Sequence, residues 1–156
     1  MITSPGPARS RIPSGTATKI QITADCADPA VMMAFWGAAL GYVEEPPPPG
    51  YASWTDYATA LDIPRSQWRG AVVDPAGVGP RLFFQTVPEP KTVKNRWHLD
   101  VEVSDRTGPM DERHAAIAAK VAELVRLGAT EVATIDEDGS TFTVLLDPEG
   151  NELCVQ

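Results

Sequence analysis

The chain is poor in the residues on which several common kinds of site depend. Of its 156 residues, only two are Cys (Cys26 and Cys154) and only two are His (His98 and His114). It has no CxxC pair and no closely spaced Cys/His cluster. Neither a disulfide scaffold nor a structural zinc site is therefore expected, and a reducing cytoplasm is the default localisation. No apolar run approaches the ~20 residues of a membrane span, so no membrane partner is expected.

Positive charge is also scarce. The 13 Lys and Arg residues are outnumbered by 21 Asp and Glu residues, which gives a formal net charge of −8. Nucleic-acid binding relies on clustered Lys and Arg, so nucleic acid is not an expected partner. The phosphate-binding fingerprint GxGxxG and the nucleophile motif GxSxG are absent. Residues 1–18 contain no apolar stretch typical of a secretory signal and are predicted to be a flexible tail.

One pattern occurs twice in the chain. Residues 72–85 read VVDPAGVGPRLFFQ, and residues 145–156 read LLDPEGNELCVQ. Each contains an apolar strand, an Asp-Pro-x-Gly turn and a second strand with Leu and Gln at matching positions. Such a repeat in a short chain predicts two copies of one structural module. A site between the two modules would take its residues from equivalent positions in each.

The first module is predicted to run strand, helix, then three strands. Residues 19–26 alternate with a period of two and predict a half-buried strand, with the apolar residues Ile20, Ile22, Ala24 and Cys26 on one face. Asp28 and Pro29 predict a helix start, and Gly41 marks its end. Its inward residues are expected to be Val31, Met32, Phe35, Trp36, Ala39 and Leu40. The proline-rich segment 44–50 is expected to be irregular. The segment that follows predicts a short strand at 51–54 and a short helix at 56–64.

The second module is predicted to repeat this order. Residues 96–103 alternate, with the apolar residues Trp97, Leu99, Val101 and Val103 inward. A helix is predicted at about 110–127, with Ile117, Val121, Leu124 and Val125 inward. The segment 137–140 is a strong hairpin signal between the last strands. The predicted fold class is α+β: two tandem βαβββ modules form a curled mixed sheet around a cleft, with helices on the outer face. Module one spans 19–88, a linker spans 89–95 and module two spans 96–156.

These segments resemble the vicinal-oxygen-chelate superfamily of glyoxalases, bleomycin resistance proteins and extradiol dioxygenases. The closer resemblance is to the glyoxalase-like domains common in actinobacteria. It is carried by ITADCADPAVMMAFWGAALGY, GPRLFFQTVPEPKTVKNRWHLDVEV and DPEGNELCV, and it covers roughly residues 19–156. The resemblance implies a divalent metal in the cleft, held by one residue from the first and one from the last strand of each module. The usual ligands are two His and two Glu, and the metal acts as a Lewis acid.

Transfer of that ligand set to this chain gives Gln21, Phe83, His98 and Cys154. Phe83 has no donor atom, and Cys154 suits a soft ion rather than the hard or borderline ions of this chemistry. A register slip that brought in Glu152 would turn its strand over and expose Leu153. No metal and no other cofactor is therefore expected at the superfamily's position.

Strand alternation predicts which side chains face the cleft. They are Gln21, Thr23, Asp25, Arg81, Phe83, Gln85, His98, Asp100, Glu102, Glu152, Cys154 and Gln156. The set is polar and acid-leaning, which favours a cationic or hydrogen-bonding small molecule. The alternative is a wet concavity without a ligand. Trp54, Tyr57 and Trp68 either close over the cleft or, as is more common for an irregular segment, anchor it to the sheet.

His98 is the candidate catalytic residue, because Asp100 and Glu102 on the same face would favour its protonated, imidazolium form. It would then act as a general acid, or as a base through water. The alternative is a remnant of an ancestral site. Cys154 is either a nucleophile with His98 as its partner or an inert thiol. His114 is expected to be solvated.

Three functions remain open. The first is a cytoplasmic, metal-free protein that binds or sequesters a small molecule, expected from the resemblance to be a homodimer. The second is a lyase, isomerase or dioxygenase-like enzyme that uses a divergently bound metal or His98. The third is an interaction protein with a vestigial cleft.

Overall fold

The computed structural model describes residues 18–137 and 139–156. The predicted tail, residues 1–18, therefore falls almost wholly outside the described part. The elements of the first module are β1 (Gln21–Cys26), α1 (Pro29–Leu40), β2 (Val43–Glu44), α2 (Trp54–Ala60), the short 3-10 helix η1 (Arg65–Gln67), β3 (Arg69–Val73) and β4 (Arg81–Thr86). Those of the second module are β5 (Leu99–Val101), α3 (Met110–Arg126), β6 (Thr130–Glu137), β7 (Ser140–Leu146) and β8 (Glu152–Val155).

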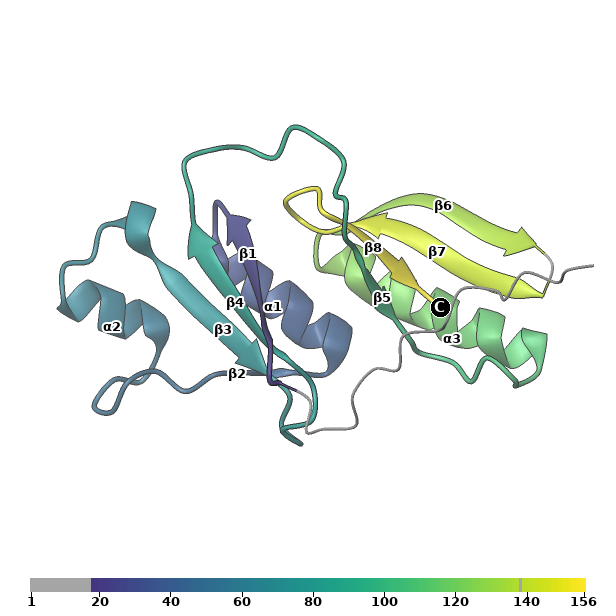
Figure 1. Ribbon diagram of the computed structural model, residues 1–156, viewed down its shortest axis with the longest axis horizontal. Helices are drawn as coiled ribbons and strands as arrows, with labels where there is room; N and C mark the ends of the chain where they lie inside the picture. Colours follow the sequence, from purple (N-terminus) through teal and green to yellow (C-terminus); the bar gives the residue numbers. More distant parts are fainter. Residues whose placement is uncertain (1–17, 138) are drawn as a thin grey trace, which may run out of the picture.

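The two modules have the same topology. Their strand orders are β1-β4-β3-β2 and β5-β8-β7-β6, and the first strand of each is parallel to the last. Figure 1 shows the two sheets side by side, with the segment that joins β4 to β5 arching between them. The sheets do not close into a barrel. The predicted α+β fold of two βαβββ modules is confirmed.

The repeated turn has the same hydrogen bonds in both copies. In the first, the Asp74 carboxylate accepts from Ala76 N at 2.8 Å, and Gly77 N donates to Asp74 O. In the second, the Asp147 carboxylate accepts from Glu149 N at 2.9 Å, and Gly150 N donates to Asp147 O. Both glycines have positive φ (69° and 85°), which glycine adopts without strain. The sequence repeat therefore reflects a repeated local structure.

Helix α1 begins and ends where its sequence predicts. The Asp28 side chain accepts from Ala30 N at 3.0 Å, and Gly41 ends the helix with φ of 67°. The inward prediction is confirmed for Met32, Phe35, Trp36 and Ala39, which are all buried. It is wrong for Val31, which is 43 % exposed. Val31 precedes Met32 by about 100° around the helix and so lies beside the buried stripe.

The inward prediction for helix α3 is likewise wrong for one residue. Ile117, Val121 and Leu124 are buried as predicted, but Val125 is 43 % exposed. Val125 lies about 100° further round the helix than Leu124, outside the face that meets the sheet. The core is one continuous cluster that draws on both modules, from Cys26 to Val155. Among the described residues, no helix is both long and apolar enough to cross a membrane.

The predicted strand at 51–54 is wrong. Ser53 instead caps α2 by accepting from Asp56 N at 3.0 Å. The second strand of the module is the two-residue β2, which pairs with Val73 and Val72 of β3. Such a short edge strand forms because β3 offers hydrogen-bond partners. Two residues are too few to show an alternating pattern in the sequence.

The predicted strand at 96–103 is shorter than expected. Pairing with β8 covers only Leu99–Val101. Trp97 was predicted to face the core, but it is 91 % exposed, because no strand or helix within residues 18–137 and 139–156 covers it.

Candidate functional site

The candidate site is a pocket of about 940 Å³ between the two modules. It opens where the edge strands β1 and β5 face each other, and the segment 87–97 lines one side. Its lining residues are Ile20, Ile22, Thr23, Ala24, Asp25, Trp36, Leu82, Val87, Glu89, Pro90, Lys91, Asn95, Trp97, His98, Leu99, Asp147, Asn151 and Glu152. The volume lies within the usual range for small-molecule sites.

The pocket has an apolar floor and a charged rim. Ile22, Leu82 and Leu99 come from the core-facing sides of their strands and meet Trp36 of α1. The floor exists because, in the described part of the chain, β1 and β5 are edge strands with no strand partner on this side, so core-facing residues border open space. The prediction of a mostly polar pocket is therefore wrong for the floor, although acids do prevail on the rim.

A buried aspartate anchors the floor. The Asp147 carboxylate is 3 % exposed and accepts from the Trp36 indole Nε1 at 3.2 Å. Asn151 donates to the same carboxylate at 2.9 Å from its side chain. The turn of module two is thereby bonded to the helix of module one, which fixes the two walls of the pocket relative to each other.

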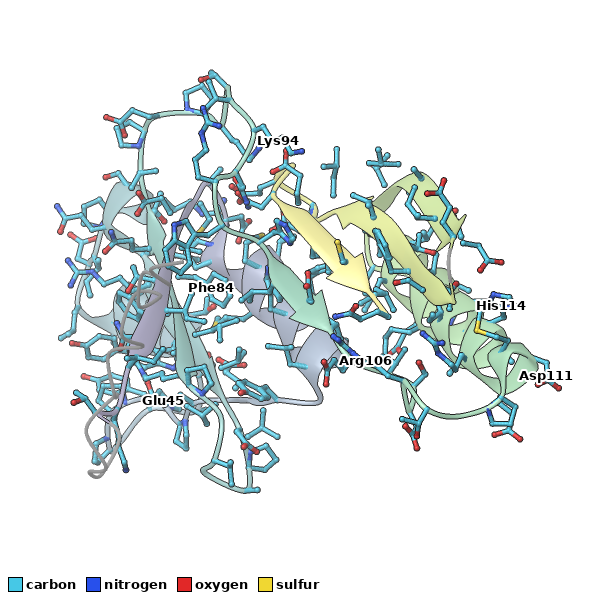
Figure 2. The ribbon with its side chains drawn as sticks, turned by 45° about the vertical axis from the view of Figure 1, so that its right-hand side comes forward. Glu45, Phe84, Lys94, Arg106, Asp111 and His114 are labelled. Carbon is cyan, nitrogen blue, oxygen red and sulfur yellow. The ribbon has the colours of Figure 1, made fainter. Side chains whose placement is uncertain are left out.

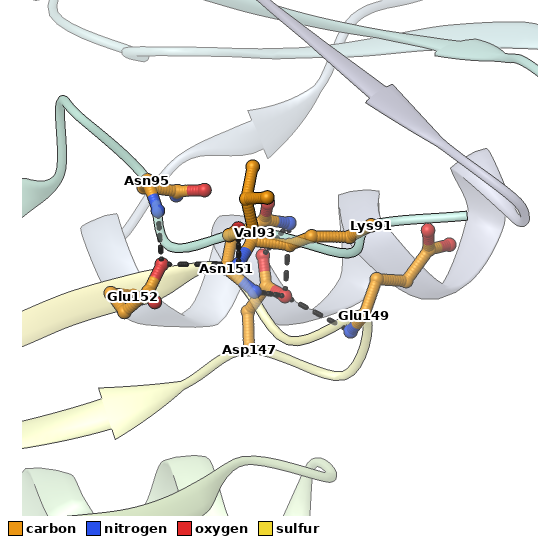
Figure 3. A network of polar contacts seen from close by, with 7 residues as sticks. All are labelled: Lys91, Val93, Asn95, Asp147, Glu149, Asn151 and Glu152. Atoms are coloured by element: carbon orange, nitrogen blue, oxygen red, sulfur yellow. Dashed lines mark hydrogen bonds and ion pairs between the residues drawn. The ribbon is translucent and has the colours of Figure 1, made fainter. Parts of the chain in front are cut away.

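Glu152 holds the connecting segment in place. Figure 3 shows its carboxylate beside the Asn95 backbone and the Lys91 side chain, at 3.0 Å from Asn95 N and 3.2 Å from Lys91 Nζ. The Asn95 hydrogen bond, with the Lys91 charge as a lesser cause, holds the pKa of Glu152 below its usual range. Glu152 is therefore ionised near neutral pH.

The predicted cleft residues of module one share one face, as expected. The register pairs Gln21 with Arg81, Thr23 with Phe83 and Asp25 with Gln85. Gln85 Nε2 donates to Asp25 Oδ1 at 2.8 Å. Of these six residues, only Thr23 and Asp25 line the pocket. The others belong to the open sheet face beside it.

In module two, His98, Asp100 and Cys154 lie together. His98 Nδ1 is 3.0 Å from Asp100 Oδ1, and Asp100 is opposite Cys154 in the β5–β8 register. Burial, and then Asp100, raise the pKa of the Cys154 thiol. A protonated thiol is a poor nucleophile, which argues against the nucleophile alternative. Leu153 is fully buried, so the register slip considered above does not occur.

Of that group only His98 lines the pocket, and the remaining predicted residues lie outside it as well. Glu102 accepts from Arg106 Nη2 at 2.7 Å, and Figure 2 shows Arg106 beyond the tip of β5. The Gln156 backbone pairs with Val101 and Val103 at the end of β8. His114, near the start of α3, is half-exposed and pairs with Asp136 at 3.2 Å, far from the first module (Figure 2).

The aromatic residues of the inserted segment serve as anchors. Trp54 Nε1 donates to Glu45 O at 2.7 Å, and Trp68 Nε1 donates to Ile63 O at 3.0 Å. Tyr57 packs edge-on against Trp54, with ring centroids 6.0 Å apart. These three side chains do not line the pocket between the modules. The exposed aromatic residue that lines this pocket is Trp97, which strand alternation predicted to lie in the core.

The four positions that the superfamily uses for a metal do not suit one here. Gln21 Oε1 accepts from Arg81 Nη1 at 2.6 Å, so a guanidinium lies where the cation would. Arg81 also stacks over the Phe83 ring at 4.9 Å and is paired with Glu45. Module one thus offers a cation and an aromatic ring, and both would disfavour a divalent ion.

Sequence reasoning missed two groups of pocket residues. The floor residues Ile22, Leu82 and Leu99 read as ordinary core positions, because alternation says nothing about which strand edges stay unpaired. The rim residues Glu89 and Lys91 lie in a segment predicted to be a linker. Its density of charges was the signal available in the sequence.

Solved structures share this arrangement of paired βαβββ modules. A glyoxalase/bleomycin resistance protein/dioxygenase family enzyme from Burkholderia phytofirmans has 18 % identity and a TM-score of 0.56, covering 86 % of this chain and 94 % of its own. The fosfomycin resistance protein FosX from Mesorhizobium loti has 11 % identity and a TM-score of 0.59, covering 93 % and 92 %. A FosX variant from Listeria monocytogenes, solved with Mn(II) and 1S,2S-dihydroxypropylphosphonic acid, has 10 % identity and a TM-score of 0.58, covering 93 % and 90 %. At these identities the likeness concerns the fold alone.

These structures have the fold that the resemblance to the vicinal-oxygen-chelate superfamily implied. The model of the family described as glyoxalase-like domain matches residues 21–156, so the chain belongs to that family. No curated protein matches the chain.

Proposed function

We propose that this chain binds a small organic molecule in the pocket between its modules, without a metal at the superfamily's four positions. The observation that carries the proposal is the pocket of about 940 Å³, which joins an apolar floor to a charged rim. Such a combination buries the body of a ligand and orients it through a few polar groups.

The rim favours a ligand with positive charge. Asp25, Glu89 and Glu152 contribute carboxylates, and Lys91 contributes a positive charge that Glu152 already pairs with. The net charge of −8 over the chain adds a long-range attraction for cations. The ligand class is therefore a flat or compact apolar body that carries a cationic or hydrogen-bond-donating group.

The experiment compares three probes of one shape and different charge: 9-aminoacridine (cationic), acridine (neutral at pH 7.5) and acridine-9-carboxylate (anionic). The expected order of affinity, measured by fluorescence titration and thermal shift, is cation, neutral, anion. A ligand at 100 times its Kd stabilises the native state by about 2.7 kcal/mol. Equal shifts for all three probes, or none, would refute the proposed ligand class.

Two variants locate the binding. Ala24→Trp fills the floor and is expected to abolish binding while the circular dichroism spectrum is retained. Glu89→Lys reverses one rim charge and is expected to weaken the cation about fivefold, or about 1 kcal/mol. The matched control is Glu137→Lys, which makes the same charge change at the exposed β6–β7 hairpin. An equal loss in both lysine variants would mean that only the overall charge matters.

A second candidate is supported by the His98–Asp100 pair. Asp100 lies 3.0 Å from His98 Nδ1, and His98 lines the pocket. A carboxylate in this position orients an imidazole for general acid–base work. If the chain is an enzyme, His98→Gln should abolish turnover but retain probe binding. Homodimerisation, expected from the superfamily, is tested by light scattering of the full chain.

A further inference from the structure

Trp97 is the most exposed large apolar residue that lines the pocket between the modules, at 91 % exposure. The indole Nε1 atoms of Trp36, Trp54 and Trp68 each donate a hydrogen bond, which fixes those three rings. An indole left in water lacks the hydrophobic stabilisation that burial would give it. A ligand that covers Trp97 therefore gains this stabilisation on binding.

We propose that Trp97 selects a flat aromatic body for the ligand, by stacking its indole on one face of the ligand's ring system. This inference rests on the proposed function and narrows it. The apolar floor and the charged rim suit a flat ligand and a compact ligand equally, whereas an indole face suits only the flat one. Trp97 is thus the residue that determines the shape of the ligand.

The backbone on both sides of Trp97 is held in place. Asn95 N donates to Glu152 at 3.0 Å (Figure 3), and Leu99 pairs with Leu153 in the β5–β8 register. Within the described part of the chain, no hydrogen bond, aromatic pair or cation–π contact involves the indole itself. The ring is therefore free to turn about its two side-chain torsions while its backbone stays at the pocket. A side chain with only two such torsions loses little entropy when a ligand fixes it.

Ile20 supplies a second exposed apolar surface, from the other module. It immediately precedes β1, is 68 % exposed and lines the same pocket as Trp97. A flat ring places one whole face against the indole and leaves its other face and its edges for Ile20 and the floor. A compact cage touches the indole with only a small part of its surface. The contact area that binding buries is therefore larger for the flat ring.

The charges of the pocket favour a ring that carries positive charge. The face of an indole is electronegative and attracts cations. Asp25 and Glu89 add carboxylates to the rim of the same pocket. A positive charge spread over a ring system is stabilised by the indole face and by these carboxylates together. The ligand class is therefore a planar aromatic cation.

The test compares two cations of different shape, 9-aminoacridine (flat) and 1-aminoadamantane (compact), by isothermal titration calorimetry at neutral pH. Trp97→Ala should weaken 9-aminoacridine about tenfold, the scale of one ring stacked on an aromatic side chain. The same variant should change the affinity of 1-aminoadamantane less than about twofold, because a cage has no ring face to stack on the indole. Trp97→Phe retains a smaller ring and should weaken 9-aminoacridine about threefold.

Val93→Ala is the matched control. Val93 is 76 % exposed in the same segment but is not among the residues that line the pocket, so both affinities should stay unchanged. Nuclear magnetic resonance reports the contact directly. The Trp97 Nε1–H signal, identified by its absence from Trp97→Phe, should shift when 9-aminoacridine is added. Circular dichroism verifies that each variant folds.

The outcomes separate this inference from the proposed function. A loss in Trp97→Ala that is confined to 9-aminoacridine supports the role of Trp97. An equal loss for both cations, or no loss for either, would overturn that role and leave the proposed function intact, provided that Ala24→Trp still abolishes binding. If neither cation bound the native chain, the proposed function itself would be refuted, and this inference with it.

Discussion

At the scale of single residues, the two thiols of the chain have different surroundings. Cys26 is 3 % exposed, and burial, with nearby carboxylates led by Glu149, raises its pKa to about 12. Cys154 is only half-buried, although burial and Asp100 raise its pKa as well. Because the thiolate is the reactive form, both thiols should react more slowly than free cysteine, and Cys26 far more slowly than Cys154.

Iodoacetamide at pH 8 is therefore expected to modify one thiol of the native protein, Cys154, and both thiols after unfolding in urea. A pKa near 12 leaves roughly a thousandfold less thiolate than free cysteine has at this pH. Intact-mass spectrometry counts the modifications. In Cys154→Ser the native protein should gain none, and native labelling of Cys26 at a comparable rate would contradict the burial argument.

Residue positions on strands were the most predictable part of the site. A period of two assigned Gln21, Thr23 and Asp25 to the face opposite Ile22 and Ala24, and the register with β4 confirms this. Trp97 marks the limit of the method. Alternation gives the side of a strand, but burial also requires something to pack against that side, and none of the residues that the structure describes covers Trp97.

At the scale of elements, the repeated turn has acquired a second use in module two. Glu149 lies within it, and its carboxylate accepts from Ala27 N at 2.8 Å and Asp28 N at 2.8 Å. These are backbone groups at the start of α1 in the other module. A negative charge there also complements the positive end of the α1 dipole. The turn thus caps a helix more than a hundred residues away in the chain.

Glu149→Ala is expected to lower the free energy of unfolding by about 1 to 3 kcal/mol, because it leaves these amides without their charged partner. Glu149→Gln retains one acceptor oxygen and should cost about half as much. Urea unfolding followed by circular dichroism measures the difference. Glu137→Ala is the control, expected to change stability by no more than about 0.5 kcal/mol. If Glu149→Ala changed the free energy of unfolding no more than that control does, the contact would not stabilise the fold.

The longer elements were predictable and the short ones were not. Helices α1 and α3 have apolar residues at helical spacing and are followed by glycines, and Asp28 caps α1, so their bounds agree with the sequence within a few residues. The two-residue strand β2 and the start of α2 at Trp54 were missed. Short elements contain too few residues to show a period, and their conformation follows from the neighbours they bond.

At the scale of the whole molecule, acidification is expected to destabilise the fold. The backbone amides of Gly79 and Ala76 hold the pKa of Asp74 below its usual value. Thr107 does the same for Asp105, and Asn95 for Glu152. A carboxylate whose pKa is lower in the folded state binds fewer protons there than when unfolded. It therefore adds to the free energy of unfolding. This addition is complete at pH values above the pKa of the carboxyl in the unfolded state, and it is lost as pH falls through its pKa in the folded state.

The urea midpoint should therefore be steady near neutral pH and fall as pH is lowered from about 5 towards 3. Asp74→Asn removes one of the three carboxylates and should flatten this dependence, because its turn then no longer titrates. Glu137→Gln, which removes a carboxylate at the exposed hairpin, should leave the slope unchanged. A midpoint that rose on acidification would contradict the assignment of these lowered pKa values.

The sequence by itself determined the duplication, the fold class and the faces of the main strands. All of these follow from local periodicity and from repeated turn residues. Only the tertiary structure decided where the pocket lies, that Arg81 faces Gln21, and that His98, Asp100 and Cys154 come together. Those features depend on which strand edges stay unpaired and on distances between segments far apart in the chain. Periodicity within a segment carries no information about either.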